Sequence, residues 1–289
     1  MAITLGGGGS ASQVNETIDI NSAENLITLD DGRVYLKGGV TSTDTSTYPD
    51  ATAEFAYSGT SFSVSSQMTY PLGMAWDGTH FWVVDSFNNL LFKYTAAGVY
   101  TGTNFSITTS ATGITWDGTH FWIVSNGNDS VLKYTAAGVY TGTSFSVAAQ
   151  DTSPRGIAWD GTYFWVLGRA SGAVYKYNAL GVYESVSFSI SAQEPYPTNI
   201  TWDGTYFYVI GTGNNSFLKY SADGTFIANV ISVYPQETAV NTALAVGTDL
   251  WAIGDTNKTA YKYQSQIGVT TNGSASQIAN GRQNYVRIK

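Results

Sequence analysis

The stretch GITWDGTHFWIVSNGNDSVLKYTAAGVYTGTSFSV, residues 113–147, decides the fold because copies of it recur along the chain. Each copy has an apolar run ending in Trp-Asp-Gly-Thr, then a Lys-Tyr pair, then Phe or Ile followed by Ser-Val or Ser-Ile. A degenerate fifth copy of the first motif covers residues 245–251. The lysines of the Lys-Tyr pairs are Lys93, Lys133, Lys176, Lys219 and Lys262. This period of about 40 residues is typical of the blades of a β-propeller.

Each copy contains four strand-like runs, which in the quoted stretch are residues 113–116, 119–125, 131–135 and 139–147. We name them strands A to D. Asp117-Gly118 links A to B and predicts a two-residue hairpin turn in which both residues take positive φ. Gly138 supplies the strained position between C and D. Four antiparallel strands in this length make one blade.

The strand count predicts how the ring closes. Five sets of strands A to C are present, but the last set, ending at Tyr263, has no strand D after it. An unattached strand D motif lies at residues 61–65. Pairing of these two segments leaves no open sheet edge, which is favourable. We therefore predict an all-β fold: a five-bladed β-propeller at 55–265 closed by an N-terminal strand, with a β arm at 1–54 and a C-terminal extension at 266–289.

Composition and charge exclude several classes of function. The formal net charge of −8 argues against a nucleic-acid partner. The chain has no cysteine, which rules out thiolate metal sites and cysteine nucleophiles. It has no apolar run of about 20 residues, so we expect no membrane insertion. The first residues lack a basic region and an apolar core, so we expect no secretory signal peptide. We expect no cofactor and no metal.

The two faces of the predicted disc differ. The A–B and C–D turns repeat almost unchanged, which indicates turn chemistry, whereas the B–C and D–A connections vary and form the better binding face. The D–A loops carry glutamine followed by an acid or Met68, with Tyr or Arg nearby. Amides and carboxylates beside tyrosines suit hydroxyl-rich ligands. The predicted ligand-binding residues are Gln67, Tyr70, Gln150, Asp151, Arg155, Gln193, Glu194, Tyr196, Tyr234, Gln236 and Glu237. Alternatively, the glutamines satisfy backbone groups where the chain crosses between blades.

Three carboxylates, Asp151, Glu194 and Glu237, raise two further possibilities. Glycoside hydrolysis needs a pair of acids flanking the bond, and Ca²⁺ takes several oxygen ligands. The acids of five-bladed glycosidases come mostly from inner strands, and the inner strands expected here contain none. We therefore assign no catalytic residue and expect a protein that is not an enzyme. The repeated Trp and Tyr are interpreted as packing between blades, and the repeated lysines as solvated.

The ends of the chain resemble bacteriophage virion proteins. Residues 31–40, DGRVYLKGGV, running on into 43–51, TDTSTYPDA, resemble segments of tail-fibre and tail-tip proteins, and the ending NYVRIK at 284–289 is similar to theirs. The resemblance implies an exposed virion appendage. Residues 1–54 would bind other virion proteins, the propeller would contact the host surface, in particular its glycans, and the assembly would be a homo-oligomer.

Two other functions stay open beside this one. One is a purely structural virion component, such as a head decoration or connector, that uses the propeller for protein docking. The other is a glycosidase. The propeller itself resembles five-bladed lectins of the tachylectin type only in architecture and blade length.

Overall fold

The structure is a computed structural model. It describes residues 54–108, 110–234 and 236–265, together with the backbone of five short strands outside these ranges. None of the described residues lies in a helix long and apolar enough to cross a membrane. The chain divides into two compact units, Ala51–Ile267 and the pair of segments Met1–Asp50 and Gly268–Lys289.

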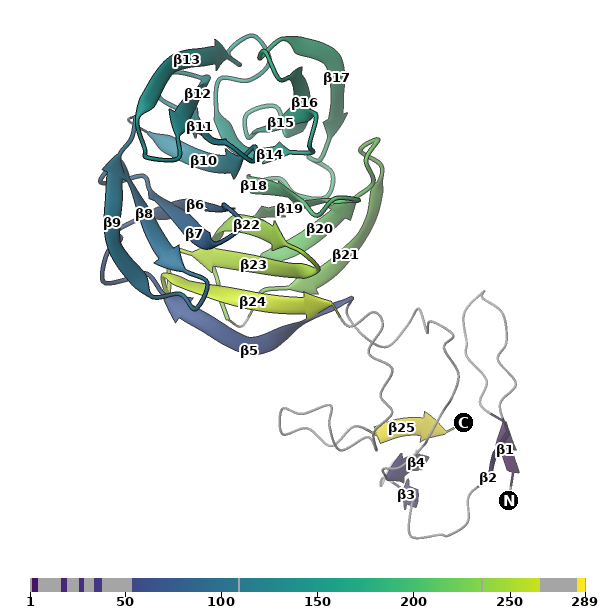
Figure 1. Cartoon of the computed structure of the whole chain (residues 1–289). Coiled ribbons are helices and arrows are strands. Elements are labelled where there is room, and N and C mark those ends of the chain that lie inside the picture. Colours follow the sequence, from purple (N-terminus) through teal and green to yellow (C-terminus); the bar gives the residue numbers. More distant parts are fainter. Residues whose placement is uncertain are drawn as a thin grey trace. The chain divides into compact units, whose positions relative to one another are not determined.

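The larger unit is a five-bladed β-propeller, which confirms the predicted fold class (Figure 1). Every blade is an antiparallel sheet of four strands. Blade 1 consists of β6 (Pro71–Trp76), β7 (His80–Asp85), β8 (Leu90–Thr95) and β9 (Tyr100–Ser106), and blade 2 of β10 (Ala111–Trp116), β11 (His120–Ser125), β12 (Ser130–Thr135) and β13 (Tyr140–Ser146). Blade 3 consists of β14 (Pro154–Trp159), β15 (Tyr163–Gly168), β16 (Ala173–Asn178) and β17 (Tyr183–Ser189), and blade 4 of β18 (Pro197–Trp202), β19 (Phe207–Gly211), β20 (Ser216–Tyr220) and β21 (Phe226–Ser232).

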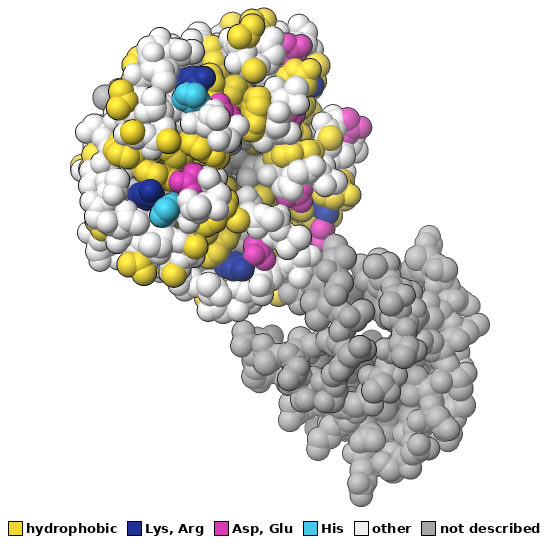
Figure 2. All heavy atoms as spheres, in the orientation of Figure 1, with side chains coloured by type: hydrophobic (Ala, Val, Ile, Leu, Met, Phe, Trp, Pro, Cys, Tyr) yellow, Lys and Arg dark blue, Asp and Glu magenta, His cyan; other side chains and the backbone are white. Residues whose placement is uncertain are grey.

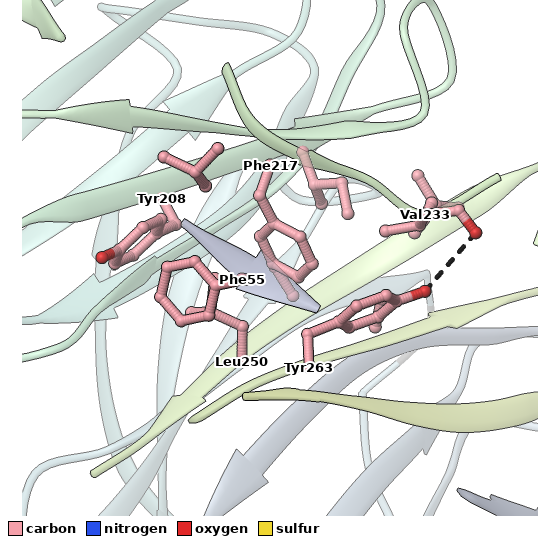
Figure 3. Packing of buried hydrophobic residues seen from close by; sticks show 11 residues of the cluster. Phe55, Tyr208, Phe217, Val233, Leu250 and Tyr263 are labelled. Carbon is pink, nitrogen blue, oxygen red and sulfur yellow. Dashed lines mark hydrogen bonds between the residues drawn. The ribbon is translucent and has the colours of Figure 1, made fainter. Parts of the chain in front are cut away.

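Blade 5 closes the ring in the predicted way. It consists of β22 (Val240–Val246), β23 (Asp249–Gly254), β24 (Thr259–Ser265) and, as its outer strand, β5 (Phe55–Ser63). Strand β5 pairs antiparallel with β24, with Phe62 opposite Ala260. Figure 3 shows the core at this closure, where Phe55 packs edge-on against Tyr208, and the hydroxyl of buried Tyr263 donates a 3.4 Å hydrogen bond to the Val233 carbonyl. Pairing of the strand motif at 61–65 with β24 therefore brings together two segments that are about 200 residues apart in the sequence.

The smaller unit contains two short sheets. Strands β1 (Ala2–Thr4) and β2 (Thr17–Asp19) pair with each other. Strand β4 (Val34–Lys37) pairs with β3 (Leu26–Thr28) on one edge and with β25 (Tyr285–Ile288) on the other. The sequence did not predict that the two ends of the chain share a sheet.

The Asp-Gly turns differ from the type expected. Only the glycine takes positive φ, +98° at Gly118, so the prediction of positive φ at both turn residues was wrong. The aspartate acts through its side chain instead. Oδ1 of Asp117 accepts the backbone N–H groups of Thr119 and His120 at 2.7 Å each, and Oδ2 accepts Nε1–H of Trp122 at 2.6 Å. This network ties the turn to the core and explains why the motif repeats, because Asp77 and Asp160 make equivalent bonds.

The hydrogen bonds of these aspartates make the free energy of unfolding depend on pH in the acid range. Burial alone would raise the pKa of Asp117, but hydrogen bonds from Trp122, Thr119 and His120 outweigh it and hold the pKa below its ordinary value. The stabilisation is therefore fully present above the unfolded pKa of about 4 and is lost as pH falls through the lower folded value. We expect Asp117→Asn to lower the free energy of unfolding by about 1–2 kcal/mol at neutral pH. Urea denaturation should show that the difference in unfolding free energy between the parent and the variant becomes smaller below about pH 4. A difference that does not depend on pH contradicts this role of the Asp117 carboxylate.

Candidate functional site

The inner strand of every blade carries a register irregularity near its start. The pairing of A with B skips one residue in each blade, and the five skipped residues are Leu72, Thr112, Arg155, Thr198 and Asn241. A bulge of this kind re-aims a side chain away from the regular alternation of the strand. All five residues line one cavity of about 150 Å³. We call it the channel-mouth cavity, since it lies where the five inner strands begin, on the face of the D–A and B–C loops.

The residue after the bulge lets the inner strands approach closely. It is glycine in blades 1 to 3, and a Cβ on Gly113 would lie only 2.5 Å from the Arg155 carbonyl oxygen and 3.0 Å from Cα of Gly156. In blade 4 the equivalent residue is Asn199. Its Nδ2 donates to Oγ1 of Thr242 in blade 5 at 3.2 Å and lies 3.5 Å from the Leu72 carbonyl of blade 1. The inner strands are therefore held together next to the ring of bulged residues.

A second ring of residues surrounds the cavity from the B–C loops. The first residue after each strand B donates its backbone N–H to the carbonyl of the residue preceding strand A. The donors are Ser86, Asn126, Arg169, Thr212 and Asp255, and the acceptors are Tyr70, Ser110, Ser153, Tyr196 and Ala239. Five of these ten positions line the cavity, namely Tyr70, Arg169, Thr212, Ala239 and Asp255. The rigid scaffold thus gathers side chains of different chemistry from one or both variable connections of every blade except blade 2.

Two arginines dominate the electrostatics of the cavity. Arg155 is half-buried, and its Nε is fully enclosed without a hydrogen-bond partner. Burial lowers the pKa of Arg155, the nearby charge of Arg169 lowers it further, and Tyr70 opposes both effects. The Arg169 guanidinium lies 5.9 Å from the ring centroid of Tyr196. Within the described ranges neither arginine forms an ion pair, although Asp255 lines the same cavity.

The predicted ligand-binding residues divide into two groups. Tyr70 and Arg155 line the cavity, and Tyr196 contacts it through Arg169. The side chains of Gln67 and Gln150 instead accept hydrogen bonds from tyrosine hydroxyls of strand C, at 3.3 and 2.9 Å. The backbone carbonyls of two others, Gln193 and Gln236, accept bonds from asparagine side chains of the B–C loops, and Tyr234 is exposed.

The three predicted carboxylates have a structural role. Asp151, Glu194 and Glu237 are buried, and each accepts backbone N–H groups from both the D–A and the B–C loop of its blade. Glu194, for example, accepts the N–H groups of Tyr196 and Gly213 at 2.9 Å each. None of the three lines the cavity. No group of three or more His, Asp or Glu placed to hold a metal occurs among the described residues. Because backbone N–H groups occupy their oxygens, these three carboxylates do not support the glycosidase and Ca²⁺ alternatives that were based on them.

The opposite face carries the uniform A–B turns. Figure 2 shows this face, recognisable by both histidines of the chain, which begin the strands that follow two of these turns. A second cavity of about 180 Å³ lies between the ends of the inner strands there, and its lining includes Trp76, Trp116, Trp159 and Trp202. Each of these rings also packs on a phenylalanine of strand B, with centroids 4.5–4.7 Å apart. These four contacts lie within single blades, whereas the repeated tryptophans were expected to pack between blades. Ring contacts between neighbouring blades come from the tryptophans of strand B, which pack on a phenylalanine of the next blade: Trp82 on Phe121, Trp122 on Phe164 and Trp165 on Phe207.

Comparison with known proteins supports the fold. No protein-family model matches the chain, and no curated protein matches it. Among solved structures, the chain is similar to the glutaminyl cyclase of Myxococcus xanthus, with 9% identity, 73% of this chain and 95% of that chain covered, and a TM-score of 0.60. It is also similar to virginiamycin B lyase from Staphylococcus aureus, with 15% identity, 87% and 85% covered, and a TM-score of 0.46. At these identities the likeness extends to the fold alone.

One of these structures corrects an expectation. We expected from the sequence that the protein is not an enzyme. The similar structure with the TM-score of 0.60 is that of an enzyme, the glutaminyl cyclase. The expectation is contradicted because an enzyme has a similar fold. The missing acids of the inner strands argued only against one kind of hydrolysis, and the chemistry of the site has to be judged from the cavity.

Proposed function

We propose that the propeller is the host-contacting part of a phage virion protein and that it binds surface glycans in the channel-mouth cavity. The convergence of the five bulged residues carries this proposal. Four of them present hydroxyl, amide and guanidinium groups to one hollow, and in each blade the residues before and after the bulge are paired with strand B. Binding residues on a rigid scaffold lose little conformational freedom when a ligand arrives.

The dimensions and chemistry of the cavity suit a sugar. A space of about 150 Å³ accommodates one six-membered ring. Thr212 offers a hydroxyl that can donate to or accept from a sugar hydroxyl. Thr112 and Asn241 donate to the carbonyls of Pro154 and Pro71, at 3.1 and 3.5 Å, and offer their oxygens as acceptors. Tyr70 at the cavity and Tyr196 beside it are 39% and 56% exposed. Their flat faces are available to cover the C–H surface of a sugar.

The phage part of the proposal rests on the ends of the chain. The resemblance to tail-fibre and tail-tip proteins involves residues 31–51 and 284–289. Strands β4 and β25 lie within these segments and pair with each other, with Leu36 opposite Val286. Two segments that resemble the same class of protein thus form one sheet. We propose that this sheet belongs to the part that binds other virion proteins.

A cavity-blocking variant tests the glycan function. Thr212→Trp places an indole at the cavity from a position where only the backbone N–H is hydrogen-bonded. Asn126→Trp is the matched control, because it occupies the equivalent position of blade 2 and does not line the cavity. On a host-glycan array we expect Thr212→Trp to weaken binding at least about tenfold and Asn126→Trp to leave it nearly unchanged.

Absence of glycan binding by the intact chain, or equal losses in both variants, contradicts the proposal. Mass spectrometry of the bound glycan after incubation reports directly whether the chain also converts it. Particles lacking the protein should adsorb poorly to host cells, and normal adsorption would contradict the host-contact role.

A further inference from the structure

We infer that the channel-mouth cavity recognises an oxyanion on its ligand, a carboxylate, phosphate or sulfate, through Arg155 and Arg169. This inference rests on the proposed function of the cavity as a ligand site and adds the chemical class of that ligand. It begins from a charge imbalance. The chain has 21 acidic and 13 basic residues, yet two of its few arginines share one cavity without an ion pair in the described part of the chain.

The nearby acids do not compensate these arginines. Asp85, at the end of β7, and Asp151, Glu194 and Glu237, in the D–A loops, lie on the same face, but backbone N–H groups occupy their oxygens. Asp255 lines the cavity without pairing with either arginine, and a single carboxylate leaves the pair with a net positive charge. Buried charges in proteins are usually paired, and an unpaired one is costly. The cavity therefore gains from any anion that enters it.

The geometry favours an oxyanion over a halide or a bare charge. A guanidinium presents its N–H donors in a planar fork that matches two oxygens of a carboxylate or phosphate. Nε–H of Arg155 is enclosed and lacks an acceptor, so one strong donor is already desolvated. The hydroxyls of Thr112 and Thr198 come from the bulges on either side of Arg155 in ring order. Both donate to backbone carbonyls, Thr112 to Pro154 at 3.1 Å and Thr198 to Ile210 and Val240 at 3.2 and 3.3 Å, so their oxygens remain as acceptors. An acidic sugar presents both kinds of group at once, an oxyanion for the arginines and hydroxyl donors for the threonine oxygens.

The experiment compares charged and neutral probes on the full chain. Saturation-transfer NMR and thermal-shift titrations are run with D-glucuronate, D-glucose 6-phosphate, D-glucose and inorganic phosphate. We expect one or both charged sugars to bind at least about tenfold more tightly than glucose. Preference for glucuronate or for the phosphate sugar distinguishes the two sources of oxyanion. Arg155→Gln and Arg169→Gln should each weaken the charged probe at least about tenfold. Lys258→Gln, which removes a cation from the same face outside the cavity lining, should not.

Melting temperature separates recognition from a structural role. Removing an unpaired, half-buried charge should leave the melting temperature of Arg155→Gln equal to or above that of the parent, whereas a structural arginine would lower it. Equal affinity for glucose and glucuronate, unaffected by either arginine substitution, overturns the inference while sugar binding stands. Binding of inorganic phosphate without any sugar supports the inference and contradicts the glycan function. If no probe binds, the inference is wrong, and the glycan array alone judges the proposed function.

Discussion

Replacement of Phe62 by Ala is expected to lower the free energy of unfolding by about 3 kcal/mol and to release the closing strand β5. Phe62 lies on the strand that joins the two ends of the propeller. Its ring centroid is 5.4 Å from that of Phe81, 5.6 Å from Tyr94 and 5.7 Å from Trp251. Two of these rings belong to blade 1 and one to blade 5. The side chain therefore helps to hold β5 in blade 5, where no hairpin joins β5 to its partner strand β24.

The repeat supplies a matched control for this prediction. Phe145 has the equivalent neighbours, with centroids 6.0 Å from Trp122, 5.9 Å from Phe164 and 5.3 Å from Tyr177. Phe145→Ala should cost a similar free energy, but its strand D, β13, is joined to strand C, β12, by a short hairpin turn, whereas β5 has no such link to β24. Only Phe62→Ala should expose residues 54–66 to a protease under native conditions, because a terminal strand can detach locally.

Urea denaturation gives the free energies, and limited proteolysis with mass spectrometry locates the cleavage. Cleavage in the same place and at the same rate in both variants contradicts the view that β5 is a separable closing element. Hydrogen exchange of the amides in β24 gives a second measurement. These amides should lose protection in Phe62→Ala and retain it in Phe145→Ala.

The fold could be predicted because the number and order of strand motifs in the repeat are compatible with a closed five-bladed ring. Each copy has four strand-like runs with turn residues at fixed places, and the unattached strand D motif at 61–65 matches the one set of strands A to C that lacks a strand D. What could not be predicted was how the Asp-Gly turn is made. Its aspartate was interpreted by its backbone preference, whereas the carboxylate of Asp117 binds Trp122, which lies five residues away in the next strand.

The candidate site was predicted only in part, for a physical reason. The inner strand of the quoted stretch was expected to begin at Gly113, so the residue before it, Thr112, was not compared with its equivalents around the ring. A bulge leaves no regular sign in the sequence, and the five bulged residues share no chemistry. Tyr70 and Arg155 were selected only because they follow the D–A loops. The glycines were the available signal, since they recur where the inner strands of neighbouring blades come closest.

The second prediction with a large expected loss of stability concerns the buried carboxylates of the D–A loops. Glu194 is buried and accepts three backbone N–H bonds of 2.9–3.0 Å from Tyr196, Gly213 and Asn214. Glu194→Met leaves these donors without an acceptor. We expect a loss of about 3 kcal/mol, or about 6–12 °C in melting temperature for a domain of this size. Differential scanning calorimetry measures it, and a loss below about 1 kcal/mol contradicts this role of the carboxylate.

Blade 1 shows how the same bonds are made without that acid. It has Met68 at the position of Glu194, and Asp85 takes over from the end of strand B, where blade 4 has Gly211. Asp85 accepts the N–H groups of Tyr70 and Phe87 at 3.1 Å each, which are the equivalents of the two shortest bonds of Glu194. The two blades thus form the same loop hydrogen bonds in two ways, with the acid in the D–A loop of blade 4 and at the end of strand B in blade 1. A Cβ on Gly211 would lie 2.5 Å from Cδ of Glu194, so one blade cannot hold both.

We therefore expect the effect of Gly211→Asp on stability to change sign, from destabilising in the parent chain to stabilising when Glu194 is replaced by Met. Gly211→Asp alone should destabilise more than Glu194→Met, because it forces two carboxylates into one buried space. The double variant Glu194→Met with Gly211→Asp reproduces the arrangement of blade 1. It should be more stable than either single variant, although Cβ at position 211 also lies 2.5 Å from the Tyr196 carbonyl oxygen and the backbone must shift. A coupling energy of at least about 2 kcal/mol from the double-mutant cycle supports this account. Additive losses would show that each carboxylate acts only in its own surroundings and that the blades do not share one loop design.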